Sequence, residues 1–199
     1  MRQIPLPATM AFILALVGTA QAEPLKIGAL APAFSGLPGV DGKSYGLDDF
    51  KDKDVLVVCI TCNHCPVAVK YEDRIIEFWK KFGTGRVGFI AINPNNGPAD
   101  RLDKMKERAK EKGFAFPYVH DASQQVAVKL GATVTPEFFV FNKERQLVYH
   151  GTFDNNMKIE KATKQYVIPA VEATLHGKKV ETPQTAPFGC GIEYEKKKK

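Results

Sequence analysis

The hydrophobic pattern of the chain alternates between short apolar runs and helical stripes. The runs at 55–60 and 87–92 are almost wholly apolar, which is typical of strands buried on both faces of a sheet. From about Cys65 to Phe82, apolar residues recur every three or four positions and Gly83 follows, which predicts an amphipathic helix. Its apolar stripe should pack on the sheet, while charged side chains such as Arg74 should face solvent.

The same alternation continues through the second half of the chain. The pattern predicts a charged helix at 100–112, a helix after Asp121 that ends at Leu130, and a last helix at about 163–176. Two apolar runs, 137–141 and 146–153, predict an antiparallel hairpin. Parallel crossovers together with one terminal hairpin predict a three-layer α/β/α sandwich with a mixed central sheet.

The first 22 residues have the features of a secretory signal peptide. Arg2 supplies a positive start, the apolar core from Ala8 to Val17 is short, and the small residues around Ala22 form a cleavage site. The core is too short to span a bilayer, and an uncleaved anchor is the alternative. We expect cleavage after Ala22, a periplasmic or secreted protein in an oxidising compartment, and no stable membrane insertion. The remainder divides into a folded domain, 23–180, and an extended tail, 181–199.

Composition argues against several other classes of protein. The formal net charge is +6, and part of the excess is the Lys-rich end at 196–199. Because no basic stripe interleaved with aromatic residues accompanies these lysines, we expect no nucleic-acid partner. The sequence has no nucleotide-binding or flavin signature, so we expect no cofactor.

The candidate chemistry is concentrated between Cys59 and Pro66, where the first buried strand meets the first helix. A helix N-terminus stabilises a thiolate, so we expect Cys62 at this position to be the nucleophile. Cys65, three residues later, can then resolve a mixed disulfide formed on Cys62. His64 lies between them and can add positive charge or a hydrogen bond. This spacing predicts thiol–disulfide exchange by Cys62, Cys65 and His64.

The chain resembles the redoxin branch of the thioredoxin-fold proteins, bacterial thiol–disulfide oxidoreductases related to the AhpC/TSA peroxiredoxins. The matching segments, besides the Cys62–Cys65 motif, are Gly28–Phe34, Tyr71–Arg74, Phe116–Tyr118, Thr135–Phe139 and Gly189–Cys190.

This resemblance implies a thioredoxin-like fold with an N-terminal β-hairpin extension around 40–43, which would cover one edge of the sheet. It also implies a cis peptide bond before Pro136 in a loop that faces the cysteine pair. The Thr135 backbone would then bind an extended substrate polypeptide, so Thr135 and Pro136 are the expected substrate-binding residues. Glu137 either relays protons to Cys65 or is a solvated carboxylate. The expected partners are protein thiols or disulfides and an upstream protein that donates or accepts electrons.

Two further cysteines are possible accessory residues. Cys59 lies within an apolar strand, so a small buried core residue is favoured over a redox role. Cys190 is an isolated cysteine in the tail of an exported protein, which suggests a bond or exchange with one of the three central cysteines. A free thiol or an intermolecular bridge is the alternative. Sequence does not choose among the three possible pairings.

The direction of electron flow stays open at this stage. A histidine before the second cysteine resembles the sites of disulfide donors and isomerases, because stabilising the thiolate makes the pair more oxidising. The redoxin resemblance includes reductases, which we favour slightly. Antioxidant peroxidase activity is a second interpretation, since Cys65 precedes a proline as in peroxiredoxins. In that family a Thr and an upstream Pro stand where this chain has Cys62 and Val58.

Metal binding is a third interpretation. Cys59, Cys62 and Cys65 imitate part of an iron–sulfur motif, but Val69 stands where the fourth ligand would be. Copper handling would use Cys62, Cys65 and His64 as ligands. The favoured interpretation includes no metal. His120, His150 and His176 have no ligand spacing and are expected to be surface or core residues.

Overall fold

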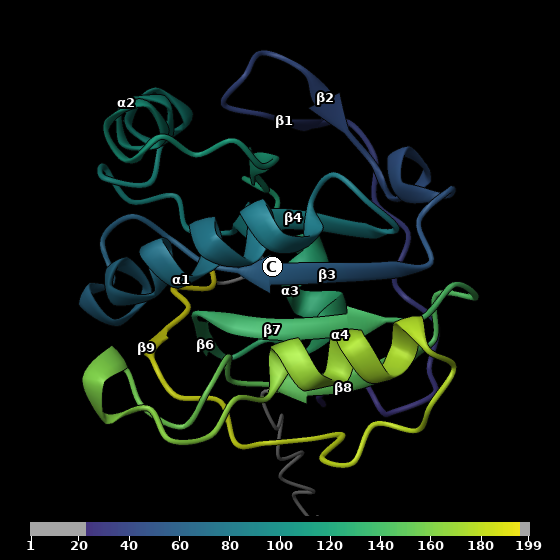
Figure 1. Cartoon of the computed structure of the whole chain (residues 1–199). Coiled ribbons are helices and arrows are strands. Elements are labelled where there is room, and N and C mark those ends of the chain that lie inside the picture. Colours follow the sequence, from purple (N-terminus) through teal and green to yellow (C-terminus); the bar gives the residue numbers. More distant parts are fainter. Residues whose placement is uncertain (1–22, 196–199) are drawn as a thin grey trace, which may run out of the picture.

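A five-stranded sheet forms the centre of the protein, in the order β5-β4-β3-β7-β8 (Figure 1). In the computed structural model, which describes residues 23–195, β3 pairs in parallel with β4 and antiparallel with β7. The strands are β3 (Val55–Ile60), β4 (Val87–Asn93), β5 (Tyr118–His120), β7 (Glu137–Phe141) and β8 (Leu147–Gly151). Every residue of β3, β4 and β7 is buried, as their continuous apolar runs predict. The expected mixed sheet is confirmed.

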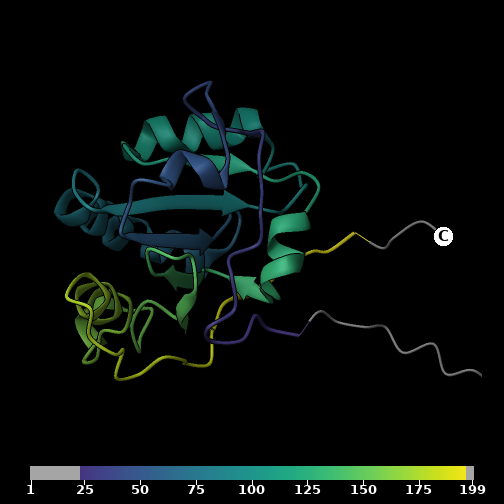
Figure 2. The same ribbon diagram turned by 90° about the vertical axis from the view of Figure 1, so that its right-hand side faces the viewer.

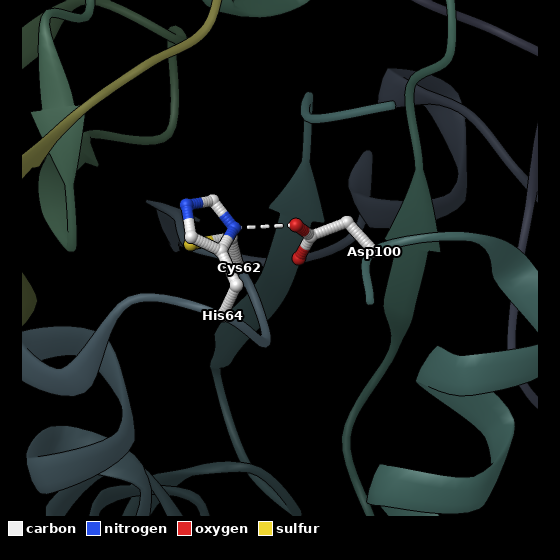
Figure 3. A group of neighbouring side chains, drawn as sticks. All are labelled: Cys62, His64 and Asp100. Atoms are coloured by element: carbon white, nitrogen blue, oxygen red, sulfur yellow. Dashed lines mark hydrogen bonds and ion pairs between the residues drawn. The ribbon is translucent and has the colours of Figure 1, made fainter. Parts of the chain in front are cut away.

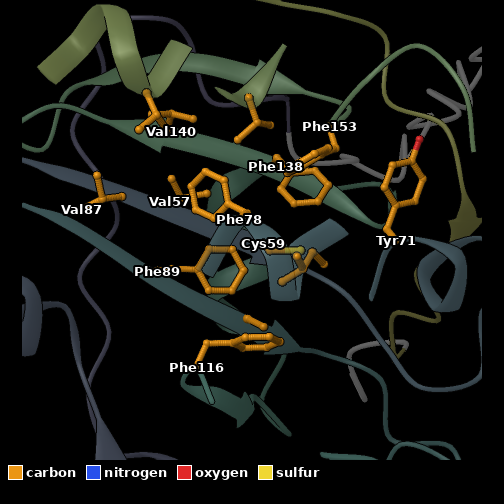
Figure 4. Close-up of a cluster of buried hydrophobic side chains, with 14 of the residues drawn as sticks. Val57, Cys59, Tyr71, Phe78, Val87, Phe89, Phe116, Phe138, Val140 and Phe153 are labelled. Carbon is orange, nitrogen blue, oxygen red and sulfur yellow. The ribbon is translucent and has the colours of Figure 1, made fainter. Parts of the chain in front are cut away.

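Helices cover both faces of this sheet and complete the three layers (Figure 2). They are α1 (Pro66–Phe82), α2 (Leu102–Lys112), α3 (Gln125–Leu130) and α4 (Val167–Leu175), with short 3-10 helices at Leu47–Phe50 and Ile159–Lys161. Side chains of α1, α2 and α4 form one hydrophobic core with the sheet, in which Phe78 of α1 packs near Val57 and Phe89 (Figure 4). Val126 and Leu130 of α3 belong to the core on the other face.

The N-terminal hairpin is also confirmed. It consists of β1 (Leu37–Pro38) and β2 (Ser44–Tyr45), which pair antiparallel around a turn at Gly42, where φ is +83°. The Val40 amide donates to the Tyr118 carbonyl at 2.9 Å, so the hairpin covers the edge strand β5.

The tail after α4 is extended and returns to the centre of the molecule. Within it, β9 (Cys190–Gly191) pairs antiparallel with β6 (Val134–Thr135), which precedes β7 (Figure 1). Residues far apart in sequence are thereby brought to the loop between β3 and α1.

The last helix starts later than predicted. It begins at Val167 rather than near 163, with Pro169 in its first turn, where the missing amide costs little. The preceding residues instead form backbone bonds, such as Asn155 amide to Lys164 carbonyl at 3.0 Å. The helix predicted after Asp121 is α3, and the Asp121 side chain lies before it and accepts the Val126 amide at 2.8 Å.

One prediction for the surface of α1 is wrong. Arg74, expected among the exposed charges, is buried and pairs with Asp154 beyond β8. The predicted helical periodicity is correct, but the segment after β8 covers this part of the polar face of α1.

The predicted signal peptide and the Lys-rich end lie outside the described residues. Within residues 23–195, no helix is long and apolar enough to cross a membrane.

Candidate active site

The cysteine motif occupies the connection between β3 and α1. Cys65 is the N-cap of α1 and its sulfur accepts the Ala68 amide at 3.4 Å, while Pro66 takes the first helical position. The sequence prediction that Cys62 occupies the helix N-terminus is therefore wrong, because the helix begins one turn later. Cys62 lies in the loop before it.

Cys65 is bonded to Cys190 across 125 residues of sequence. The two Cα atoms are 5.9 Å apart, within the usual range for a disulfide. The prediction that the tail cysteine bonds with a central cysteine is confirmed, whereas the expected Cys62–Cys65 pair is not joined here. All four cysteines lie in the described part of the chain, and Cys59 and Cys62 are its two free thiols.

The loop of Thr135 and Pro136 faces these sulfurs. The peptide bond between the two residues is cis, as the resemblance implied. The Cys62 sulfur lies 3.1 Å from the Thr135 hydroxyl oxygen, and the Cys65 sulfur lies 3.2 Å from the Thr135 carbonyl oxygen. A single residue thus contacts both sulfurs of the motif.

Cys62 is a deeply buried thiol, with 3% of its surface exposed. Burial raises the pKa of Cys62, and the nearby Asp100 carboxylate raises it further. Hydrogen bonds from Thr135 and Asn95 lower the pKa of Cys62, but they do not cancel the effect of burial. The expectation of a thiolate favoured by the helix N-terminus is therefore corrected, because Cys62 lies before the helix and burial raises its pKa.

Asp100 orients His64 beside Cys62 (Figure 3). His64 Nδ1 lies 2.5 Å from an Asp100 oxygen, and His64 is 34% exposed whereas Asp100 is 1% exposed. The other Asp100 oxygen accepts the Asn63 amide at 2.7 Å and the Asn93 side-chain amide at 3.0 Å. Hydrogen bonds with Asn63, Asn93 and His64 thus fix the Asp100 carboxylate. The bond with His64 also fixes the orientation of the imidazole ring.

The same side chains form a candidate group for holding a metal ion within residues 23–195. Ligand atoms of Cys62, His64 and Asp100 all lie within 4.8 Å of one another. The set predicted for copper contained Cys65, whose sulfur is engaged in a disulfide in this structure, and Asp100 takes its place in the group.

Glu137 is a buried residue rather than a solvated carboxylate, so that alternative is wrong. One of its oxygens pairs with His150 Nε2, and the other accepts the Thr133 and Val134 amides at 2.8 Å and 3.1 Å. Glu137 therefore braces β6, the strand that contains Thr135. The proton relay to Cys65 stays a prediction.

Cys59 has the environment expected of a core residue. It is fully buried on β3, and burial raises its pKa well above the ordinary thiol value. This agrees with the favoured interpretation of Cys59 as a small hydrophobic side chain.

Asp100 and Asn95 are the site residues that sequence reasoning missed. Asp100 was assigned to the charged helix, but α2 begins at Leu102. Both residues follow the carboxyl end of β4, the neighbour of β3 in the sheet. Their position after a buried parallel strand is the signal that could have identified them.

A mixed sheet between helices, with cysteines beside a cis-proline loop, defines a thioredoxin-like fold. The Redoxin family model matches residues 26–167, and the chain belongs to the Redoxin family. A search of curated proteins gave no match.

Solved structures agree with this assignment. A hypothetical protein from Sinorhizobium meliloti 1021 is 34% identical with a TM-score of 0.81, over 87% of this chain and 97% of that one. An uncharacterized conserved protein from Geobacillus kaustophilus is 31% identical with a TM-score of 0.80, over 85% and 93%. The peroxidoxin BcpB of Mycobacterium tuberculosis shares the fold at 20% identity and a TM-score of 0.60, over 77% and 97%. Family and fold together support an oxidoreductase activity in general.

Proposed function

We propose that the protein is an exported thiol–disulfide oxidoreductase that acts on protein thiols or disulfides through Cys62 and Cys65. The observation that supports this most directly is the convergence of both sulfurs on Thr135, at 3.1 Å and 3.2 Å. A cysteine that attacks a client and a cysteine that resolves the product must lie this close to a common point. Export rests on the signal-like residues 1–22.

The exchange requires the two cysteines in distinct roles. In reduction, the Cys62 thiolate attacks one sulfur of a client disulfide, the client bond breaks, and the other client sulfur leaves as a thiolate. The Cys65 thiolate then attacks the Cys62 sulfur, which forms the Cys62–Cys65 disulfide and releases the second client thiolate. Oxidation of a client is the reverse sequence. In either direction Cys65 must first be freed from Cys190.

The backbone beside the cysteines is suited to a polypeptide. Thr135 lies in a strand that accepts an antiparallel partner. An extended client can gain affinity from main-chain hydrogen bonds at such an edge.

His64 and Asp100 are positioning and electrostatic residues in this proposal. The Asp100 carboxylate holds the ring of His64 next to Cys62, with the ring partly open to solvent. From this position the imidazole can exchange a proton with solvent as Cys62 gains or loses its own.

The test is disulfide reduction in insulin with a small dithiol as the electron source. Cys62→Ser and Cys65→Ser should each abolish the acceleration seen with the native protein, and Cys65→Ser should accumulate a mixed disulfide on Cys62. Cys59→Ala is the matched control, because Cys59 is buried in the core and should leave the rate unchanged per folded molecule. Full activity in both serine variants would contradict the mechanism.

The direction of electron flow is measured by equilibrating the protein in glutathione buffers and mapping each cysteine by alkylation. A potential near −270 mV, the value for thioredoxin, would identify a reductase, and one near −120 mV an oxidase. We propose the reductase direction.

Peroxide reduction is the second candidate, and the Cys65–Cys190 bond favours it. Peroxide converts the Cys65 thiolate to a sulfenic acid, and the Cys190 thiol condenses with it to give this disulfide and water. Reduced protein treated with dilute peroxide would then form the Cys65–Cys190 bond rapidly, and Cys190→Ser would accumulate the sulfenic acid on Cys65. Slow reaction of both proteins, at the rate of an ordinary thiol, would reject this candidate.

A further inference from the structure

The C-terminal tail pairs with the strand that contains Thr135. Cys190 is directly opposite Thr135, and Gly191 is opposite Val134, in an antiparallel register. The Ile192 amide continues the pairing by donating to the Thr133 carbonyl at 3.1 Å. The tail therefore pairs with the backbone edge of β6, as Figure 1 shows for β9 and β6. Thr135 of this edge contacts both sulfurs.

Two buried side chains hold the tail beyond Cys190. Asn95 accepts the Glu193 amide at 3.1 Å. Gln124 donates to the Glu193 carbonyl at 2.8 Å and accepts the Glu195 amide at 2.7 Å. Asn95 and Gln124 lie in the body of the fold and are almost fully buried, yet these bonds go to main-chain atoms of the tail. Together they form a built site for extended backbone.

The residue before Cys190 is held against the Thr135 backbone. A Cβ atom added to Gly189 would overlap the Thr135 carbonyl oxygen and lie 2.7 Å from the carbonyl carbon. A Cβ atom added to Gly191 would meet nothing within 4 Å. The site thus selects glycine on one side of the cysteine and tolerates side chains on the other.

We propose that the tail segment 189–195 occupies the client edge as an internal mimic of a client, bonded through Cys65 rather than through the Cys62 that attacks an outside client. It closes the site in the oxidised protein and indicates that the edge takes extended segments with glycine before a cysteine. This inference rests on the proposed exchange function and adds its substrate class and its regulation. A client with the same local sequence would make the same main-chain bonds once the tail leaves.

Cys62 provides the step that opens the site. Its thiolate attacks the Cys65 sulfur, the Cys65–Cys190 bond breaks, and the electron pair leaves on Cys190, which takes a proton from solvent. The products are a Cys62–Cys65 disulfide and a Cys190 thiol. The oxidation level is unchanged, so no outside oxidant or reductant is needed. Cys62 is placed for this step because it packs with Cys65 and Cys190 in one cluster.

The test compares two glycine-to-alanine changes that flank Cys190. Native protein and both variants are oxidised, quenched with acid and mapped without reduction. In Gly189→Ala the fraction of Cys65–Cys190 linkage should fall by about tenfold, with Cys62–Cys65 in its place, since docking is blocked. Gly191→Ala should match the native protein. Equal fractions of the Cys65–Cys190 linkage in the two variants would overturn the proposal.

A peptide in trans tests the substrate class directly, because the same protein is compared with all three peptides. The probe copies residues 186–195 and is added to Cys190→Ser protein that contains the Cys62–Cys65 disulfide. Its thiol should open this disulfide about ten times faster than that of a peptide with Ala at position 189, and within about twofold of one with Ala at 191. The peptide sulfur forms a mixed disulfide with one of the two cysteines, and the other cysteine leaves as a thiolate. Equal rates for the three peptides would reject the glycine requirement.

These results are separate from the fate of the proposed function. If native protein fails to accelerate insulin reduction while Gly189→Ala still changes the disulfide map, the exchange function fails and the closure stands. If native protein is active and the glycine variants behave alike, the closure fails and the exchange function stands.

Discussion

The buried ion pair between Arg74 and Asp154 ties α1 to the chain that follows β8. The Arg74 side chain is 5% exposed and that of Asp154 is 0% exposed. Arg74 Nη1 donates to both Asp154 oxygens, at 2.8 Å and 2.6 Å, and the Tyr71 hydroxyl donates to one of them at 3.0 Å. Arg74 also donates to the carbonyls of Asn156 and Met157. One guanidinium therefore satisfies a buried carboxylate and two carbonyl groups.

We predict that Arg74→Met lowers the free energy of unfolding by about 3–5 kcal/mol, because Asp154 is left as a buried charge without its cation. This is a large part of the 5–15 kcal/mol typical of a domain. The measurement is equilibrium unfolding in urea with the Cys65–Cys190 bond intact. Cysteine exchange per folded molecule should be unchanged, since Arg74 has no contact with the sulfurs.

Lys81→Met is the matched control for this prediction. Lys81 also connects α1 to a later element, through Glu172 of α4 at 2.8 Å, but both side chains are about half exposed. Its loss should cost less than about 1 kcal/mol. The double change Arg74→Met with Asp154→Leu should recover part of the loss, since it removes the unpaired buried charge but leaves the Tyr71 hydroxyl without its acceptor. A loss below about 1 kcal/mol in Arg74→Met would refute the reasoning.

Three further predictions concern the Cys62 thiol in the oxidised protein, read as its rate of alkylation by iodoacetamide. First, because burial raises the pKa of Cys62, the thiolate fraction should be small at pH 7. The alkylation rate should therefore still rise with pH above about 8.5, the ordinary pKa of a cysteine thiol, and a plateau below that pH would contradict this. Second, Asp100→Asn removes a nearby negative charge, so the pKa of Cys62 should fall and alkylation at pH 7 should become several-fold faster, and a slower rate would reject this. Third, Thr135→Val removes a hydrogen bond that is worth about 1.5 kcal/mol or more to a charged group, so alkylation should slow by about tenfold; an unchanged rate would exclude that role.

The elements that could be predicted from the sequence are those whose pattern is local. The continuous apolar run of β3 and the helical spacing of apolar residues in α1 can be seen in the sequence alone. Gly42 marks the turn between β1 and β2, and Gly83 marks the end of α1. The hairpin of β7 and β8 is likewise set by two neighbouring runs and a short turn. Burial and hydrogen bonding along one segment are enough to specify such elements.

The contacts that could not be predicted join segments far apart in the chain. The partner of Cys65 depends on where the tail pairs with β6, and no local sequence pattern specifies that position. Asp100 fits the polar face of a helix as well as it fits a loop, so periodicity could not separate the two. Arg74 also fits a polar face, and its burial results from the chain after β8.

The position of the tail links the accessibility of Cys62 to its chemistry. Cys190 packs against Cys62 and Cys65, so the docked tail contributes to the burial that raises the pKa of Cys62. In the closed form the thiolate fraction of Cys62 is therefore small. The disulfide in contact with Cys62 is Cys65–Cys190, which holds the tail. Attack on Cys65 is intramolecular, so it competes well against outside disulfides even at a small thiolate fraction. Once the tail has left and the electron donor has reduced the Cys62–Cys65 disulfide, Cys62 is less buried and its pKa falls, so the change that admits a client also increases the reactivity of the cysteine that meets it.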